Sequence, residues 1–228
     1  MKANKKMVKK QYPFQRAKKD NLELADRMLR WISFPISKFL VRHTSITPNE
    51  VTIFSFLLSL AGGFFFLQGG HNNLIIGGIL VFLRQIFDQV DGEVARIKLL
   101  RSSLGKWLDG VTGYLGTEVI ILSLAAGIGT TFAYMVGAFT AIAYPLQYLF
   151  VYFYKMEVTG SQQQIFLGKE NRFSSLRYIY GSALFYVLVP LFAFLNRPLW
   201  ALLFFAAVGN IFWMGTLVMQ YLELQRSK

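Results

Sequence analysis

Long apolar segments separated by short polar ones dominate the chain from residue 51 to residue 222. The clearest apolar runs are residues 51–67, 74–87, 119–153, 183–195 and 199–222. A helix of about 20 apolar residues is long enough to cross the hydrocarbon core of a bilayer. The run 119–153 is too long for one span, and the Gly/Thr-rich segment 127–131 divides it into two. The pattern therefore predicts an all-α integral membrane protein with six transmembrane helices.

Turn-forming residues between the runs predict where the helices begin and end. Thr47-Pro48 is a natural helix start, because proline fits the first turn of a helix. We expect helices over residues 49–68, from the polar turn 69–73 to residue 98, over residues 105–126, and then ending near residues 154, 195 and 222.

The first 43 residues follow a different pattern from the rest of the chain. Residues 1–19 are basic and polar, whereas apolar residues recur at helical spacing over residues 21–42, with basic residues between them. This spacing predicts an amphipathic helix that lies in the membrane interface, and Pro35 is expected to kink or interrupt it. We therefore divide the chain into an N-terminal interfacial region, 1–43, and a six-helix membrane domain, 44–228.

The basic residues, which give a net charge of +12, gather on alternate sides of the predicted helices. Lys and Arg occur in the N-terminus, in the loops 98–106 and 155–177, and in the C-terminal tail, whereas the turns 69–73 and 127–131 contain none. The positive-inside rule then places both termini in the cytoplasm of a multi-pass plasma-membrane protein. Attraction to anionic lipids explains this charge without nucleic acid as a partner. The absence of cysteine excludes disulfides and thiolate catalysis.

Acidic residues stand at the end of the second predicted membrane helix, where an apolar surface is expected. At about 100° per residue, Asp88, Asp91, Gly92 and Ala95 share one helix face, with Arg96 at its edge. Ionisable residues in a membrane span are costly, and they usually face a polar cavity and have a function there. Two carboxylates with small residues between them favour a site for a bulky polar ligand.

The third predicted helix adds a further carboxylate at the same depth. Gly105 is expected to open this helix, Asp109 follows one turn later, and Gly113 one turn after that. Three converging carboxylates without His or Cys suit a hard divalent cation such as Mg²⁺ or Mn²⁺. Such ions commonly bridge substrate phosphates, so we expect a substrate that contains pyrophosphate.

The spacing of these residues resembles the signature of the CDP-alcohol phosphotransferase (CDP-alcohol phosphatidyltransferase) family. The matching residues read Asp88-x-x-Asp91-Gly92-x-x-Ala95-Arg96, then eight residues, then Gly105-x-x-x-Asp109. The segment 46–52, which contains Asn49 and Thr52, is similar to the family's first membrane helix. The residues around the signature are most similar to those of prokaryotic members, including members that act on inositol phosphates.

The resemblance implies a function and roles for individual residues. It implies a transferase of phospholipid biosynthesis that moves a phosphoalcohol from a CDP-linked donor, CDP-diacylglycerol by default, to an acceptor alcohol with release of CMP. Two metal ions on Asp88, Asp91 and Asp109 would hold the pyrophosphate. The nucleotide would contact Asn49, Thr52, Asp88, Gly92, Ala95, Arg96 and Gly105. The resemblance also implies a homodimer.

Gly113 departs from the family pattern. The family has a fourth aspartate at this position, taken as the general base for the acceptor hydroxyl, and glycine has no side chain. Glu118 lies nine residues after Asp109, about 180° around an ideal helix, and is expected to face away. Thr112 is nearer the right face but is no base at neutral pH. General-base assistance typically contributes about 10²–10⁴-fold, so its loss would slow turnover without abolishing nucleotide binding.

Several alternatives remain open from the sequence. Lys155, Lys169, Arg172 and Arg177 bind an acceptor phosphate or simply follow the positive-inside rule, and Arg96 binds nucleotide or extends to the interface. The chain is an active transferase or a degenerate relative that binds donor and metal without turnover. A transporter with an acidic cation path is the third hypothesis, which the signature disfavours. The acceptor and the choice between a lipid and a soluble CDP-donor are not readable.

Overall fold

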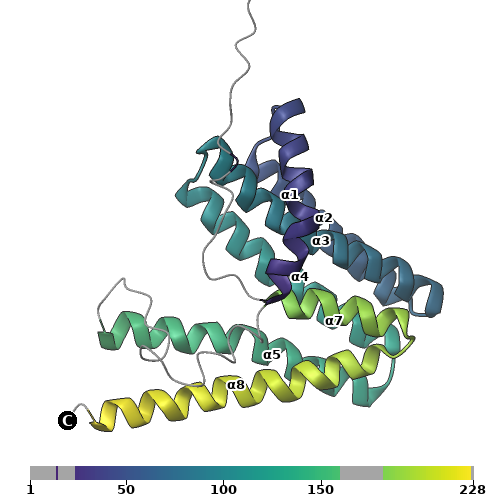
Figure 1. The fold of residues 1–228 in the computed structure, drawn as a ribbon. Helices are drawn as coiled ribbons and strands as arrows, with labels where there is room; N and C mark the ends of the chain where they lie inside the picture. Colours follow the sequence, from purple (N-terminus) through teal and green to yellow (C-terminus); the bar gives the residue numbers. More distant parts are fainter. Residues whose placement is uncertain (1–13, 15–23, 160–181, 227–228) are drawn as a thin grey trace, which may run out of the picture.

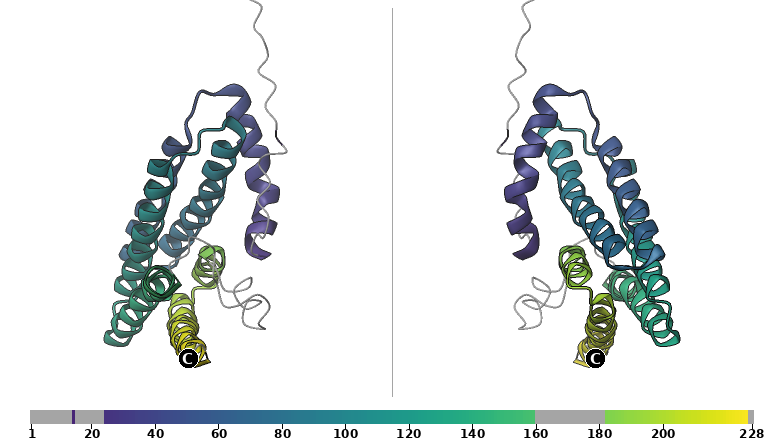
Figure 2. Two further views of the ribbon diagram at one scale, coloured as in Figure 1. Left: turned by 90° about the vertical axis from the view of Figure 1, so that its left-hand side faces the viewer. Right: turned by 90° about the vertical axis from the view of Figure 1, so that its right-hand side faces the viewer.

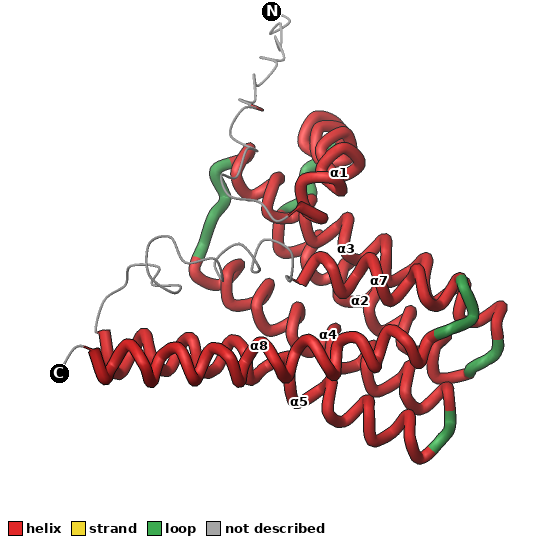
Figure 3. The backbone as a smooth tube through the Cα atoms, turned by 60° about the horizontal axis from the view of Figure 1, so that its bottom comes forward, coloured by secondary structure: helices red, strands yellow, loops and turns green. Residues whose placement is uncertain are grey.

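The computed structural model describes residue 14 and residues 24–159 and 182–226 of the chain. Every regular element in these residues is a helix (Figure 3). The elements are α1 (Leu24–His43), α2 (Pro48–Gln68), α3 (His71–Lys98), α4 (Ser103–Ile128), α5 (Thr131–Tyr154), the π-helical turn η2 (Lys155–Thr159), α7 (Ser182–Phe194) and α8 (Pro198–Arg226). The all-α prediction is confirmed for the described residues, and the predicted helix ends lie within a few residues of these bounds.

Five of the described helices, α2, α3, α4, α5 and α8, are long and apolar enough to cross a membrane. Large apolar side chains such as Phe64, Phe139 and Ile211 are exposed on them, as lipid-facing residues would be. Helix α7 is also apolar but has 13 residues, or about 20 Å, against a hydrocarbon core of about 30 Å. The chain is therefore a multi-pass membrane protein, and the sixth span stays a prediction.

The helices pack as two groups, which are joined by α7 and by the contact of α4 with α5. Helix α2 packs against both α3 and α4, and α5 lies along α8 (Figure 1). Helix α7 contacts α3 on one side and α8 on the other. Its side chain Tyr186 is fully buried in the apolar core with Phe66, Ile120 and Leu202. This packing holds α3 and α4 on either side of α2, so side chains from three helices can converge.

A capping box fixes the start of α2, as the Thr47-Pro48 pair predicted. The Glu50 amide donates to Thr47 Oγ1 at 3.4 Å, and the Thr47 amide donates to Glu50 Oε2 at 2.7 Å. Pro48 occupies the first turn, where its missing N–H costs no hydrogen bond. The local sequence therefore determines where this helix begins.

Glycines hold the C-terminal ends of α2 and α4 in close backbone contact. A Cβ atom on Gly127 would lie 1.8 Å from the carbonyl oxygen of Phe66, and one on Gly69 would lie 2.7 Å from the carbonyl oxygen of Gly127. Gly69 also has a positive φ of 64°, which side chains disfavour. Helix α4 ends at Ile128 and α5 begins at Thr131, so the predicted division of the long apolar run is confirmed.

Helix α1 lies on the outside of the bundle and packs mainly on α3 (Figure 2). Its buried side chains Leu29 and Val41 face the protein, while Trp31 and Phe39 are exposed. The helix runs through Pro35 without interruption, contrary to one reading of the sequence. Pro35 is on the exposed side, where its missing hydrogen bond does not disturb the contact with α3. Its location in the membrane interface and the division of the chain at residue 43 stay predictions.

A polar contact joins α1 to α3 beside the apolar one. Glu93 on α3 is buried and accepts hydrogen bonds from Ser37 at 2.6 Å and from Ser33 at 3.3 Å. Arg30 Nε lies 3.6 Å from the same carboxylate and balances its charge. Because Glu93 is two residues from Asp91, this contact ties α1 to the acid-bearing part of α3.

Candidate metal and nucleotide site

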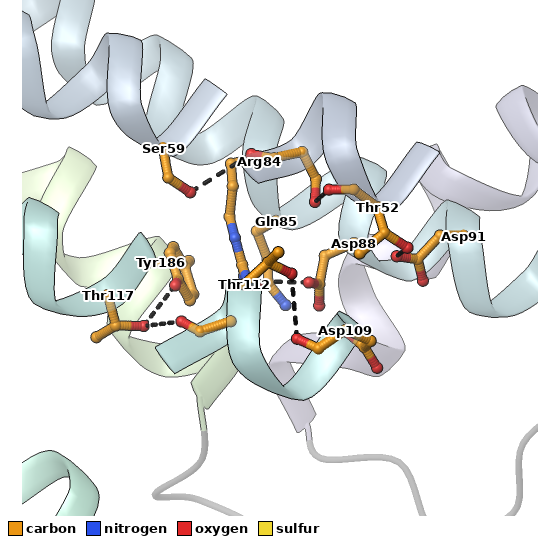
Figure 4. Close-up of polar contacts among 12 residues, drawn as sticks. Thr52, Ser59, Arg84, Gln85, Asp88, Asp91, Asp109, Thr112, Thr117 and Tyr186 are labelled. Atoms are coloured by element: carbon orange, nitrogen blue, oxygen red, sulfur yellow. Dashed lines mark hydrogen bonds and ion pairs between the residues drawn. The ribbon is translucent and has the colours of Figure 1, made fainter. Parts of the chain in front are cut away.

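Three carboxylates from two helices meet beside α2. Asp88 and Asp91 come from α3 and Asp109 from α4, and one ligand oxygen from each lies within 4.8 Å of the others (Figure 4). Asp91 is buried, Asp88 is partly exposed and Asp109 is exposed. The structure thus brings together the three residues that the sequence analysis named, and the cluster opens on the side of Asp109.

Thr52 of α2 holds the most buried carboxylate in place. Its Oγ1 donates a 2.6 Å hydrogen bond to Asp91 Oδ2, and both residues are buried. The bond fixes the orientation of Asp91, as groups that bond a metal ligand commonly do. Thr52 therefore contacts the acidic cluster itself, and its expected contact with the nucleotide stays a prediction.

The small residues of the signature allow close approaches around the cluster. A Cβ atom on Gly105 would lie 3.1 Å from Asn49 Oδ1, so the start of α4 lies against the start of α2. A Cβ atom on Gly92 would lie 3.1 Å from Arg96 Nη1, so the Arg96 side chain lies over Gly92. Ala95 is partly exposed beside them. These residues therefore lie at the same end of the bundle as the carboxylates.

Arg84 is part of the site, although the sequence analysis did not single it out. Its side chain is 4% exposed, and its Nη2 lies 2.9 Å from Asp88 Oδ1, one helical turn along α3. Its Nη1 donates to Gln85 Oε1 at 3.1 Å, and its guanidinium lies over the ring of Tyr186, 4.0 Å from the centroid. The available signal was a single arginine inside the apolar run 74–87, four residues before an aspartate.

Gly113 faces this arginine across the gap between α4 and α3. A Cβ atom on Gly113 would lie 3.6 Å from Arg84 Nη2, which is ordinary contact. Thr112 does not take the place of a base, because its hydroxyl donates to the Leu108 carbonyl at 2.8 Å. Glu118 does not belong to the acidic cluster found in the described residues. Its Oε1 is buried and has no hydrogen-bond partner among those residues.

Part of the predicted site lies outside the described residues. Lys169, Arg172 and Arg177 fall between residues 160 and 181, and the side chain of Lys155 is likewise not described. Their assignment to an acceptor phosphate therefore stays a prediction.

The donor atoms of the cluster fit a hard divalent cation. All three ligands are carboxylate oxygens, the type that Mg²⁺ and Mn²⁺ prefer. Octahedral coordination at about 2.1 Å puts ligand oxygens roughly 3 to 4.2 Å apart, close to the 4.8 Å within which the three oxygens lie. Small side-chain movements would therefore let the three carboxylates share one ion.

Parts of the chain are similar to two named proteins. It is 32% identical over 113 residues to the bifunctional IPC transferase and DIPP synthase of Aquifex aeolicus, a match that covers 50% of this chain and 25% of that protein. It is 35% identical over 83 residues to the archaetidylinositol phosphate synthase of Pyrococcus horikoshii, covering 36% of this chain and 42% of that protein. The chain thus matches 25% of the length of the first relative and 42% of the length of the second.

Two further comparisons, one of the fold and one of the sequence, cover most of the chain. The structure of Mycobacterium tuberculosis phosphatidylinositol phosphate synthase with CDP-DAG bound aligns with a TM-score of 0.61 at 18% identity, covering 84% of this chain and 94% of that one. This likeness shows a shared fold. The sequence profile described as CDP-alcohol phosphatidyltransferase matches residues 45–212, which include α2 to α5, α7 and every residue of the acidic cluster. The chain therefore belongs to the CDP-alcohol phosphatidyltransferase family.

Proposed function

We propose that this protein transfers a phosphoalcohol group, a phosphatidyl group in the first instance, from a CDP-linked donor to an acceptor alcohol and releases CMP. The observation that carries the proposal is the convergence of Asp88, Asp91 and Asp109, with Asp91 oriented by Thr52. Membership of the family supports the reaction class. The solved relative with CDP-DAG bound supports a lipid-linked donor, since its fold is shared over most of this chain.

The residues around the cluster have separate tasks in this proposal. A bound divalent cation would neutralise charge on the donor pyrophosphate, as metal ions do in other phosphoryl transfers. Asp88, Asp91 and Asp109 would hold that ion, and Thr52 keeps Asp91 in one orientation. Asn49, Gly92, Ala95, Arg96 and Gly105 would form the nucleotide pocket in this proposal.

The acceptor is best sought among phosphorylated polyols. The named relatives include an archaetidylinositol phosphate synthase, and inositol phosphate is therefore the first acceptor to test. Lys155, Lys169, Arg172 and Arg177 would bind its phosphate in this proposal. Positive-inside topology explains the same residues equally well, so the acceptor panel also contains glycerol phosphate, inositol and serine.

A second candidate function follows from Gly113. No carboxylate stands at this position, and the neighbouring group is the Arg84 guanidinium, which is no base. A protein that binds the CDP-donor and metal without turnover would have this arrangement. The two candidates share a substrate class and differ only in whether CMP is released.

The cellular setting is part of the same proposal. The basic loops and termini would face the cytoplasm of a plasma membrane, and α1 would lie in the interface with Trp31 and Phe39 toward lipid. A homodimer, which the family resemblance implies, would leave one site in each chain. Accessibility labelling of the termini and cross-linking in membranes test these two points.

CMP release from CDP-diacylglycerol is the experiment that tests the function. The purified full chain is assayed in lipid nanodiscs with Mg²⁺ or Mn²⁺ and the acceptor panel, and donor binding is measured in parallel. Asp91→Asn is the site variant, and Glu118→Gln is the matched control outside the cluster. Acceptor-dependent CMP release that Asp91→Asn abolishes supports the transferase. Donor binding without release supports the second candidate, and the absence of both overturns the proposal.

A further inference from the structure

We propose that Arg84 is a built-in counter-cation of the acidic cluster, so that the donor-free protein binds one divalent cation at this site and not two. The inference deepens the proposed function and rests on its metal site. It concerns the ion count, which the resemblance put at two, and it assigns a role to an arginine outside the signature residues.

The contacts of Arg84 are those of a residue committed to the cluster. A charged side chain in a membrane span is costly unless it is paired, and Arg84 is 4% exposed near the middle of α3. Its ion pair, at 2.9 Å, is with Asp88, one of the three candidate ligands. The ring of Tyr186 supports the other side of the guanidinium. The charge is therefore held against the metal site by groups from two helices.

The charges of the site balance with a single divalent ion. Asp88, Asp91 and Asp109 together carry three negative charges, and Arg84 contributes one positive charge at hydrogen-bond distance from the first of them. One divalent cation neutralises the remaining two charges. A second divalent cation would leave a net positive charge of two next to the fixed, buried guanidinium of Arg84.

The available ligand atoms lead to the same count. One oxygen from each of the three carboxylates lies within 4.8 Å of the others, which is close to the roughly 4.2 Å across one octahedral shell. Arg84 already binds Oδ1 of Asp88, and Thr52 already binds Oδ2 of Asp91. Two-metal sites hold their ions about 3.5–4 Å apart and need carboxylates that bridge or add to both. Asp88 and Asp91 therefore each have an oxygen that a protein group already engages.

Gly113 and Arg84 complement each other in this arrangement. The arginine lies where a side chain on residue 113 would point, since a Cβ atom there would be 3.6 Å from Nη2. A carboxylate added at residue 113 would reach the guanidinium and pair with it. Glycine in place of a carboxylate makes the site more positive by one charge, and the Arg84 guanidinium adds another positive charge. Together they supply the two positive charges that a second divalent ion would bring.

The test counts the Mn²⁺ ions bound per chain in the donor-free, tag-free protein. Electron paramagnetic resonance measures the free Mn²⁺, and the bound number is the difference from the total. Asp91→Asn supplies the background. We expect one ion in the unmodified chain and one in Gly113→Asp, because the new carboxylate pairs with Arg84. We expect two ions in the Arg84→Met/Gly113→Asp double variant, where the fourth carboxylate has no guanidinium to pair with.

A conservative replacement separates charge from a purely structural role. The Arg84→Lys/Gly113→Asp double variant keeps the positive charge, and we expect it to return the count to one. Arg197→Met, which removes an exposed arginine at the α7–α8 turn, is the matched control and should leave one ion. If both double variants bind the same number of ions, the role of Arg84 in setting the count is overturned.

The unmodified chain alone keeps the inference testable if a variant does not fold. One ion supports the inference, and two ions overturn it while leaving the proposed metal site intact. No ion above the Asp91→Asn background overturns the proposed metal site itself. The failure of this inference is therefore distinguishable from the failure of the proposed function.

Discussion

Thr52 and Asp91, which lie on different helices, share a buried hydrogen bond of 2.6 Å in the acidic cluster. The bond leaves the other oxygen of Asp91 for a ligand and prevents the carboxylate from turning toward the apolar surroundings. It also ties α2, which packs on both α3 and α4, to the residues that these helices bring together.

Removal of this hydroxyl should weaken the site without unfolding the protein. We expect Thr52→Val to lower Mn²⁺ affinity by about 10–100-fold, the usual cost of losing a group that orients a metal ligand. Thr52→Ser should restore most of the affinity. Titration with Mn²⁺ measures the effect, and Ser59→Ala, which removes a buried hydroxyl two turns along α2, is the control. Unchanged affinity in Thr52→Val would contradict the orienting role.

Restoring a carboxylate at residue 113 should have little effect while Arg84 is present. Because Arg84 Nη2 lies next to this position, the carboxylate of Gly113→Asp would be held in an ion pair and would be a poor base. We expect CMP release to change by less than about tenfold, well below the 10²–10⁴-fold typical of general-base assistance. A rate gain of about a hundredfold or more in the single variant would show that Arg84 does not capture the new carboxylate.

Removal of divalent cations should destabilise the folded protein. A ligand present at 100 times its dissociation constant stabilises the state that binds it by about 2.7 kcal/mol. We therefore expect EDTA to lower the Tm of the unmodified chain in detergent and Mn²⁺ to restore it. The Asp91→Asn variant should have the same Tm under both conditions, and a shift of equal size in that variant would place the stabilising ion elsewhere.

The contact between α1 and α3 should contribute measurably to stability. Ser37→Ala removes the 2.6 Å hydrogen bond to buried Glu93 and leaves that carboxylate oxygen without this donor. An unsatisfied buried polar group costs about 1–3 kcal/mol, more when charged. Thermal unfolding in detergent measures the loss, with exposed Ser45→Ala as the control. Equal Tm values for the two variants would show that Glu93 finds another donor.

The glycine contact at the far end of α2 and α4 should not tolerate a side chain. Gly127→Ala would place a Cβ atom 1.8 Å from the Phe66 carbonyl oxygen, so the two helices would have to separate. We expect a loss of at least about 2 kcal/mol, in the range of overpacked cores. Gly215→Ala on α8, where a Cβ atom meets nothing within 4 Å, should be neutral or stabilising. Equal stability of the two variants would contradict the close approach.

The sequence by itself determined the features that depend on neighbouring residues. The apolar runs and the turn signals at Thr47-Pro48 and 127–131 located the helices, because capping and helix breaking are local. The helical period of 3.6 residues placed Asp88 and Asp91 on one face. The residue types and spacing of the signature identified the family. The structure corrected one of these points, since α1 continues through Pro35 without interruption. The sixth span stays a prediction, because α7 has 13 residues in the described part of the chain.

Only the tertiary structure decided which helices meet at the site. Thr52 and Asp91 are 39 residues apart, and no local rule joins them. Arg84 is a single charge in an apolar run of the sequence, and only the fold places it between Asp88, Tyr186 and Gly113. The sequence shows Gly113 only as the position of a missing base, whereas the structure shows that the buried Arg84 guanidinium is its neighbour. The charge balance of the site depends on every charged group within a few ångströms, and a linear sequence does not contain these distances.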